Sequence, residues 1–207
     1  MLGKRRTVIL DADGTLYDLI GGVIRRVRNQ FAHILHREDF TQYDLRNLVP
    51  DRPDINHKII EWFSDARFYH ELEPFPGVAE ALLPLAEYGK LVVVTARRRE
   101  FLRASSLAAA RDFPGVTMTF EHRKGEHKAS VLSVLPGAVV AFDDNEMAAM
   151  QYLKKGLRVC LIGAPQAPYT KIPFGRHPKL SIHGSFPEAA EKFLATRIPG
   201  VRSGMAS

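Results

Sequence analysis

The 207-residue sequence contains a single cysteine, Cys160, and it has no long apolar run, no internal repeat and no low-complexity tract. One cysteine excludes an internal disulfide and is compatible with a reducing compartment, so we expect a cytoplasmic protein. No apolar segment is long enough to cross a bilayer. The short apolar segment near the N-terminus runs directly into acidic residues, unlike a secretory signal. We therefore expect no membrane partner.

The charge of the chain is unbalanced towards the positive side. Lysine and arginine together number 29 against 23 acidic residues, which gives a net charge of +6 and a pI of about 9.5. Such a surface favours anionic partners, namely phosphorylated small molecules, nucleotides or nucleic acid, although it also serves solubility alone. The basic residues are scattered, and we find no nucleic-acid-binding motif or continuous basic stripe. We therefore expect a small phosphorylated partner in preference to a nucleic acid.

Short apolar segments rich in valine and isoleucine alternate with stretches of helical periodicity. The apolar segments lie at residues 7–11, 90–96, 116–120, 138–144 and 158–163. They do not alternate between apolar and polar residues, which is typical of strands buried on both faces. Strands that alternate with helices predict an α/β fold, a Rossmann-like parallel sheet with helices on both faces. A helix is also expected at 77–88 and a last amphipathic helix at 185–197.

One region interrupts this alternation. Between residues 18 and 73 there is no strand candidate, and apolar residues such as Val23 and Val27 recur at helical spacing. We therefore expect a small helical cap at 18–73, inserted after the first strand. The core domain then comprises residues 1–17 and 74–200, and residues 201–207 are expected to form a disordered tail.

Polar residues that can do chemistry follow several of the predicted strands. Asp11 and Asp13 follow the first strand, Thr95 ends the second, and Asp143 and Asp144 end the fourth. The carboxyl ends of parallel strands meet at one edge of a sheet, so we expect these residues to converge. Aspartate and threonine are also good helix caps. A helix cap explains any one of these residues, but it explains the whole set poorly.

Converging carboxylates suit one kind of ligand in particular. Mg²⁺ takes oxygen ligands and binds through a few carboxylates together with substrate phosphate oxygens. An aspartate can attack phosphorus, and a second one nearby can protonate the leaving oxygen and then activate water. The pattern therefore predicts Mg²⁺-dependent phosphoryl chemistry.

The segments "DADGTLYD", "VVVTAR" and "AFDDN", together with a lysine, resemble the four motifs of the haloacid dehalogenase (HAD) superfamily. The resemblance implies a HAD-type fold in which Asp11 is the nucleophile and a Mg²⁺ ligand. It makes Asp13 the general acid and base, with its backbone carbonyl on the metal. It also implies that Thr95 binds the transferring phosphoryl group.

The remaining two motifs supply the rest of the implied site. Asp143 and Asp144 match the acidic motif that completes the metal site, and the family pattern favours Asp144 as the direct ligand. Lys128 is the preferred motif lysine, and Lys124 is the alternative. Because dehalogenation needs no acid at the position of Asp13, its presence favours a phosphatase that works through an aspartyl-phosphate.

The stretch from "EWFSDARFYHELEPFPG" to "VVVTAR" and the later Pro168-Tyr169 pair are similar to the 5'(3')-deoxyribonucleotidases. This resemblance implies a 5'-nucleotidase acting on (deoxy)nucleoside monophosphates. The chain departs from that subgroup at two places. A whole helix is expected between the motif lysine and the acidic pair, and Thr170 stands where asparagine is common.

The predicted substrate-binding residues come from two parts of the chain. Aromatic side chains in the cap can stack on a nucleobase, or they can form the cap's own core. Arg97 can contact a phosphate, or it can be exposed at the start of its helix. The candidates are Thr95, Ala96 and Arg97 after the second strand, and Trp62, Phe63, Phe68 and Tyr69 in the cap.

Two other functions are compatible with the sequence. The first is a HAD phosphatase for another small phosphoester, such as a sugar phosphate, or for a nucleic-acid end. The second is a HAD-fold binding protein without activity, but members of that kind usually lose a nucleophile or a metal carboxylate. All of these residues are present here, so the sequence favours an enzyme.

Overall fold

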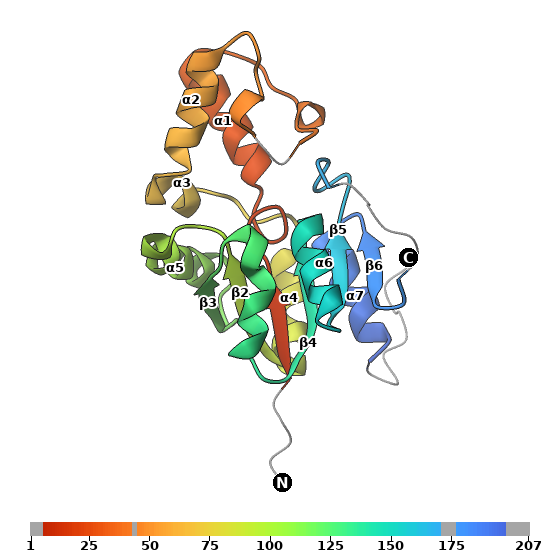
Figure 1. Ribbon diagram of the computed structural model, residues 1–207. Coiled ribbons are helices and arrows are strands. Elements are labelled where there is room, and N and C mark those ends of the chain that lie inside the picture. The colour runs from red at the N-terminus through yellow and green to blue at the C-terminus, as the bar shows by residue number, and fades with distance from the viewer. Residues whose placement is uncertain (1–5, 43–44, 171–176, 198–207) are drawn as a thin grey trace, which may run out of the picture.

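The computed structural model describes residues 6–42, 45–170 and 177–197, and it has a central sheet with a group of helices beyond one end (Figure 1). The expected tail at 201–207 lies outside the described residues. The sheet has six strands, all paired in parallel, in the order β3-β2-β1-β4-β5-β6. The strands are β1 (Thr7–Leu10), β2 (Lys90–Thr95), β3 (Met118–His122), β4 (Ala138–Asp143), β5 (Arg158–Ile162) and β6 (Leu180–His183). The predicted α/β fold is confirmed.

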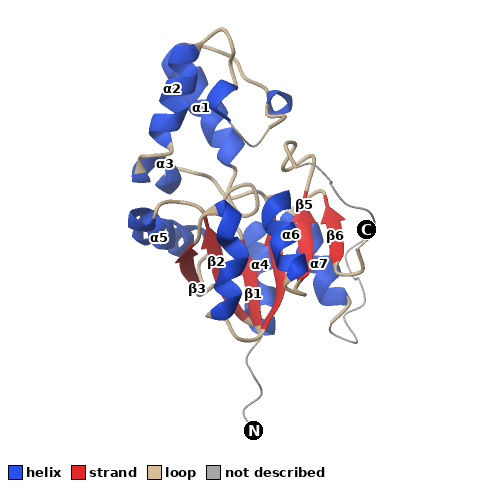
Figure 2. Cartoon of the chain, viewed as in Figure 1, coloured by secondary structure: helices blue, strands red, loops and turns tan. Residues whose placement is uncertain are grey.

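Helices surround this sheet and also form the group beyond its carboxyl edge (Figure 2). The α-helices are α1 (Leu19–Phe31), α2 (Pro53–Trp62), α3 (Ala66–His70), α4 (Val78–Tyr88), α5 (Leu102–Asp112), α6 (Glu146–Lys154) and α7 (Phe186–Ala195). The 3₁₀ helices are η1 (Arg37–Asp39), η2 (Leu45–Asn47), η3 (Arg99–Phe101) and η4 (Gly125–Ser133). We call the segment from α1 to α3, with η1 and η2, the helical insert.

Both faces of the sheet are covered, which explains why the strand sequences do not alternate. Successive side chains of a strand point to opposite faces. Val8 and Leu10 join one apolar cluster with α4 and α7, whereas Ile9 joins a second cluster with η4 and α6. All three are essentially unexposed. A strand with apolar neighbours on both sides needs apolar residues at every position.

Three elements differ from the sequence-based expectation. β3 begins at Met118, two residues later than predicted, and it is an edge strand with half-exposed side chains. β6 was not predicted, because its four residues follow a segment rich in proline and glycine and Ile182 on it is exposed. The segment after β3 is the 3₁₀ helix η4, with non-helical geometry at His127, and not the regular helix that we expected there.

The helical insert shares its apolar core with the sheet. Val23 from α1, Ile59 from α2 and Phe68 from α3 belong to the same cluster as Val8 and Leu10. The insert is therefore held over the carboxyl ends of the strands by continuous apolar packing. Within the described ranges, no helix combines the length and the apolar character that crossing a bilayer requires.

Candidate active site

The acidic residues lie between β1 and β4, where the order in which the chain adds strands to the sheet reverses. From β1 the chain proceeds to β2 and β3 on one side, and β4 to β6 lie on the other side. Ligands of such sheets bind outside the carboxyl ends of the strands at this switch point. Asp11 follows β1 directly, and its backbone N–H continues the pairing with Phe142 of β4 at 2.8 Å. The pairing therefore fixes the start of the acidic loop against β4.

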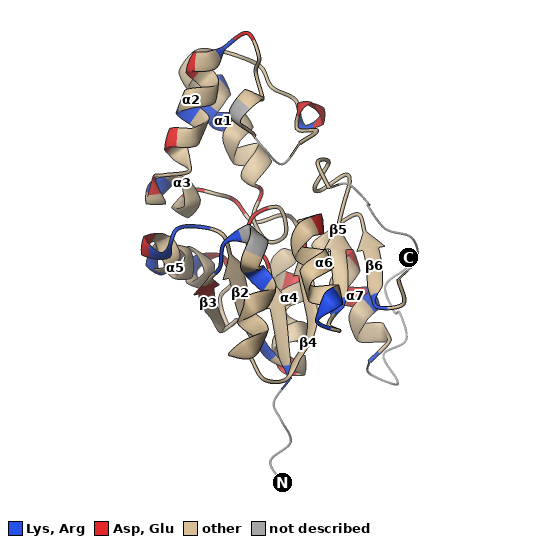
Figure 3. Cartoon of the chain, in the orientation of Figure 1, with Lys and Arg blue, Asp and Glu red and all other residues tan. Residues whose placement is uncertain are grey.

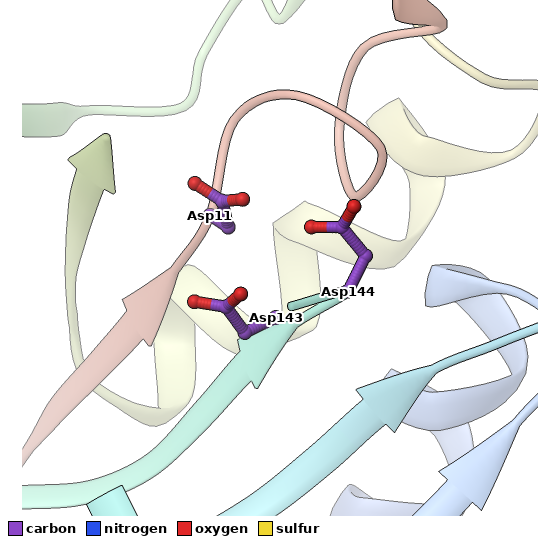
Figure 4. Close-up of side chains that lie close together, drawn as sticks. All are labelled: Asp11, Asp143 and Asp144. Carbon is purple, nitrogen blue, oxygen red and sulfur yellow. The ribbon is translucent and has the colours of Figure 1, made fainter. Parts of the chain in front are cut away.

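Asp11, Asp143 and Asp144 point toward one another at this edge (Figure 4). Each offers a carboxylate oxygen, and these oxygens all lie within 4.8 Å of one another. All three residues are buried, with exposed fractions of 4%, 1% and 1%. We call these three residues the acidic trio. The structure thus brings together three of the carboxylates that the sequence predicted to converge.

One buried lysine faces the acidic trio. The Nζ of Lys128 lies 2.9 Å from Oδ1 of Asp11 and 3.0 Å from Oδ2 of Asp143. The other candidate, Lys124, is exposed in the segment that precedes η4. Of the two lysines, Lys128 is therefore the one that the fold places in the site. One ammonium facing three carboxylates leaves the centre short of positive charge.

Two carboxyl groups of the acidic trio have raised pKa values. Burial, together with the charge of Asp11, raises the pKa of Asp143 to about 7. Burial and the charges of Asp11 and Asp143 raise the pKa of Asp144 well above its ordinary value. Buried carboxylates are costly unless they are paired, and a bound cation is the usual partner for several of them.

The two neighbouring aspartates differ in how their oxygens are used. Asp143 accepts hydrogen bonds at both oxygens, from the backbone N–H of Asn145 at 2.9 Å and from Lys128. Asp144 accepts one from the hydroxyl of Tyr169 at Oδ2. Its buried Oδ1 accepts none from the part of the chain that the structure describes. An uncommitted carboxylate oxygen beside two other carboxylates fits a Mg²⁺ ligand.

Asp13 lies at the same edge but has a different partner. Its carboxylate accepts two hydrogen bonds from Arg97, from Nε to Oδ2 at 2.9 Å and from Nη2 to Oδ1 at 2.6 Å. Arg97 is buried, with an exposed fraction of 3%. The alternative in which Arg97 is exposed at the start of its helix is therefore wrong, whereas its contact with a substrate phosphate stays a prediction, since Arg97 also lines the adjacent cavity.

Two other predicted residues frame the site from β2. Thr95 is buried at the end of the strand, and its Oγ1 accepts a hydrogen bond from the backbone N–H of Arg97 at 3.1 Å. The Thr95 hydroxyl hydrogen remains available to a ligand, since this bond uses only its oxygen. Ala96 is exposed and lines the adjacent cavity.

Sequence reasoning missed the residue that fixes the loop after β1. Gln166 is buried, and its Nε2 donates to the carbonyl oxygens of Gly14 and Thr15, both at 2.9 Å. Its Oε1 accepts from the backbone N–H of Phe186 at 3.1 Å. A glutamine so far along the chain carries no local pattern that reveals this role. Gly14 itself adopts φ +81°, and a Cβ there would collide with the Asp144 carboxylate, so the position favours glycine.

A cavity of about 500 Å³ opens between the strand ends and the helical insert. Most of the lining side chains are apolar, and Asp13 is the acidic residue among them. Its lining residues are Asp13, Leu19, Ile20, Gln42, Leu45, Ile60, Phe63, Tyr69, Ala96, Arg97 and Tyr169.

The four predicted aromatic residues divide into two pairs. Phe63 and Tyr69 line the cavity. Trp62 and Phe68 are 4% and 1% exposed, and their rings stack on each other with centroids 6.4 Å apart. For Trp62 and Phe68 the structure favours the packing interpretation, because a helix of the insert must bury its large apolar side chains against the shared core.

Comparison with known sequences identifies a family. The profile of the family described as "5' nucleotidase, deoxy (Pyrimidine), cytosolic type C protein" matches residues 5–120. The mitochondrial 5'(3')-deoxyribonucleotidase of Homo sapiens is 32% identical over 89 residues, which is 41% of this chain. The matched part spans 38% of that protein.

Comparison with solved structures shows the fold. A haloacid dehalogenase-like hydrolase from Streptococcus pneumoniae aligns with a TM-score of 0.60 at 14% identity, over 93% of this chain and 100% of that one. A HAD hydrolase from Bacillus subtilis, solved with magnesium bound, aligns with a TM-score of 0.62 at 15% identity, over 91% and 98%. At such identities the likeness concerns the HAD fold alone.

Proposed function

Because this chain belongs to the family of cytosolic type C 5'-deoxynucleotidases, we propose that it is a Mg²⁺-dependent phosphatase of nucleoside monophosphates, deoxy forms in particular. The observation that carries this proposal is the acidic trio with Lys128, placed beside a cavity that is large, mostly apolar and partly aromatic. We also propose a cytoplasmic location, because a chain with a single cysteine and no internal disulfide is compatible with a reducing compartment.

The proposed reaction has two steps. A carboxylate oxygen of Asp11 attacks phosphorus, the bond from phosphorus to the ester oxygen breaks, and the leaving oxygen takes a proton from the Asp13 carboxyl. A water molecule then attacks the aspartyl-phosphate, gives a proton back to Asp13, and releases phosphate and free Asp11. The products are an alcohol and inorganic phosphate.

The other residues of the site bind and orient the phosphoryl group. Lys128 holds Asp11 in place at 2.9 Å and adds positive charge where the phosphate oxygens arrive. The hydroxyl of Thr95 donates to a phosphoryl oxygen. Mg²⁺ would be held by Asp11, by Asp144 and by the backbone carbonyl of Asp13, and it would offset the charge that the phosphate brings to the trio.

The cavity supports a nucleoside as the rest of the substrate. Its volume of about 500 Å³ is within the range of small-molecule sites. Phe63 offers a ring that can stack on a base, Tyr69 adds a largely buried aromatic wall, and Gln42 offers an amide that can hydrogen-bond to the base. We further propose that residues 18–73 act as the cap that closes this cavity over the substrate.

The proposal is tested by phosphate release from 5'- and 3'-nucleoside monophosphates, sugar phosphates and para-nitrophenyl phosphate, each with Mg²⁺ and with EDTA. We expect deoxynucleotides to be the best substrates and EDTA to abolish release. Release from sugar phosphates alone would support the phosphatase activity but would contradict a nucleotide as the substrate. No release from any compound would favour a binding protein without activity.

The cavity assignment is tested by comparing two neighbouring aromatics. We expect Phe63→Ala to raise KM for nucleotides about 5- to 150-fold, because one stacked base contributes about 1–3 kcal/mol. Its KM for para-nitrophenyl phosphate should change less. Trp62→Ala should instead lower the free energy of unfolding by about 3–5 kcal/mol, since Trp62 is a core residue. Equal effects of Phe63→Ala on both substrates would contradict base stacking.

A further inference from the structure

Arg97 is a buried residue whose guanidinium donates hydrogen bonds to two protein side chains, those of Asp13 and Ser105. Nε and Nη2 donate to the two oxygens of Asp13, and Nη1 donates to Oγ of Ser105 at 2.9 Å. The guanidinium carbon lies 4.6 Å from the ring centroid of Tyr69 and 5.3 Å from that of Tyr17. Such contacts with ring faces are attractive for a guanidinium. The Arg97 side chain is therefore fixed from several directions.

The backbone of Arg97 is held as well. Its N–H donates to Oγ1 of Thr95, and its carbonyl oxygen lies 2.7 Å from Nδ1 of His122 on β3. Arg97 belongs to the basic segment between β2 and α5, coloured blue in Figure 3. Arg98 and Arg99 in this segment are exposed. Among these three arginines, only the buried one is aimed at a catalytic candidate.

We propose that Arg97 is a positioning residue that orients the Asp13 carboxyl for proton transfer, and that it thereby sets how well substrates with poor leaving groups are hydrolysed. This inference rests on the proposed function. Arg97 occupies two of the roughly four lone-pair positions of Asp13. The Asp13 side chain remains 20% exposed and lines the cavity, so its other positions can face the leaving oxygen.

The leaving group decides how much this positioning matters. A sugar oxygen leaves poorly unless it is protonated as the bond to phosphorus breaks, whereas a nitrophenolate leaves without a proton. A positioned general acid contributes about 10²- to 10⁴-fold to such a step. A misplacement of about 1 Å costs on the order of 10²-fold. Disturbing Arg97 should therefore affect alkyl phosphates far more than nitrophenyl phosphate.

The experiment measures kcat/KM, which reports on the steps up to formation of the aspartyl-phosphate. The substrates are a deoxynucleoside monophosphate and para-nitrophenyl phosphate, with glycerol phosphate as the alkyl substrate if nucleotides are not hydrolysed. Arg97→Lys keeps the positive charge but loses the planar guanidinium that donates to both oxygens of Asp13. We expect it to lower kcat/KM about 10²-fold for the alkyl phosphate and less than about threefold for the nitrophenyl one. Arg99→Gln, which removes an exposed charge from the same segment, should change neither.

Two further variants separate positioning from a structural role. Asp13→Asn should give the same leaving-group pattern, and Arg97→Lys in the Asp13→Asn background should cost nothing more, because residues that act as a unit are not additive. Ser105→Ala removes one anchor of Arg97 and should give a smaller loss of the same pattern. Ser105→Ala also provides the test if Arg97→Lys unfolds, as thermal unfolding will reveal.

The possible outcomes are distinct. Equal losses on both substrates, or additive losses in the double variant, would overturn the positioning role while leaving the phosphatase intact. If the unmodified protein hydrolyses no phosphomonoester in Mg²⁺, the proposed function fails and the inference fails with it. A selective, non-additive loss on the alkyl phosphate supports both.

Discussion

Lys128 and Arg97 are both buried cations at the carboxyl edge of the sheet, yet their surroundings differ. Lys128 is a point charge that contacts two of three clustered carboxylates. Arg97 donates two parallel hydrogen bonds from its planar guanidinium to one carboxylate, that of Asp13. The first centre has more carboxylates than cations and can take up a further cation, whereas the second pairs one cation with one carboxyl group in a fixed geometry. The comparison indicates that one centre is built to bind charge and the other to hold an orientation.

The largest effect is expected at the centre that is short of charge. Asp11→Asn should lower turnover at least about 10⁴-fold, because an amide cannot replace the carboxylate nucleophile. The fold should persist, since the neutral side chain is nearly isosteric. Phosphate release and circular dichroism measure the two quantities. Near-normal hydrolysis by this variant would remove Asp11 from the mechanism.

Removing each cation in turn tests the comparison directly. Lys128→Met leaves three buried carboxylates without their cation and should lower the free energy of unfolding by about 3–5 kcal/mol. Arg97→Met leaves a single carboxylate without its cation, that of the partly exposed Asp13, together with the neutral hydroxyl of Ser105, so a smaller loss is expected. Chemical denaturation in EDTA measures both.

Added Mg²⁺ should then distinguish the two variants. It should restore part of the stability of Lys128→Met and little of that of Arg97→Met, because the acidic trio lies at the first centre only. Lys124→Met, an exposed lysine from the segment before η4, is the matched control and should be neutral. Equal rescue of both variants would mean that the two centres are not electrostatically distinct.

The sequence predicted one of these centres better than the other. The convergence of the acids at the ends of β1 and β4 followed from the fold, because parallel strands bring their carboxyl ends together. The preference for Lys128 followed from its distance to the helix and strand expected after it. The pairing of Arg97 with Asp13 joins residues 84 positions apart, and no local pattern reveals it. The parallel sheet followed from the apolar segments. Edge strand β6 did not, because a half-exposed strand does not need the apolar run that marks a central one.

The aromatic residues of the helical insert also show what the sequence alone cannot predict, namely which side chains face the core. A cluster of aromatics predicted that the insert had either a core or a stacking surface, but not which ring served which purpose. The outcome depends on which side of α2 and α3 faces the sheet. Trp62 and Phe63 are adjacent in sequence, and yet one is in the core and the other lines the cavity. Only the packing of the insert decides between them.

Binding of Mg²⁺ gives the next prediction. Excess Mg²⁺ should raise the free energy of unfolding, by about 2.7 kcal/mol at a concentration one hundred times Kd. Asp144→Asn should remove most of this increase, because Asp144 carries the uncommitted oxygen. Asp54→Asn, an exposed aspartate on α2, is the control and should keep the increase. An unchanged increase in Asp144→Asn would place the cation elsewhere.

The smallest effect is expected from Gln166, which holds the loop that carries both centres. Gln166→Leu leaves the buried carbonyl oxygens of Gly14 and Thr15 without their donor and should cost about 1–3 kcal/mol of stability. These carbonyls lie next to Asp13 in the chain, whereas Asp11 is held by its pairing with β4. We therefore expect stabilisation by Mg²⁺ to survive and kcat/KM for alkyl phosphates to fall more than that for para-nitrophenyl phosphate. Loss of Mg²⁺ binding in Gln166→Leu would instead show that one loop position controls the geometry of both centres. The centres at Lys128 and Arg97 would then differ in charge but would not be positioned independently.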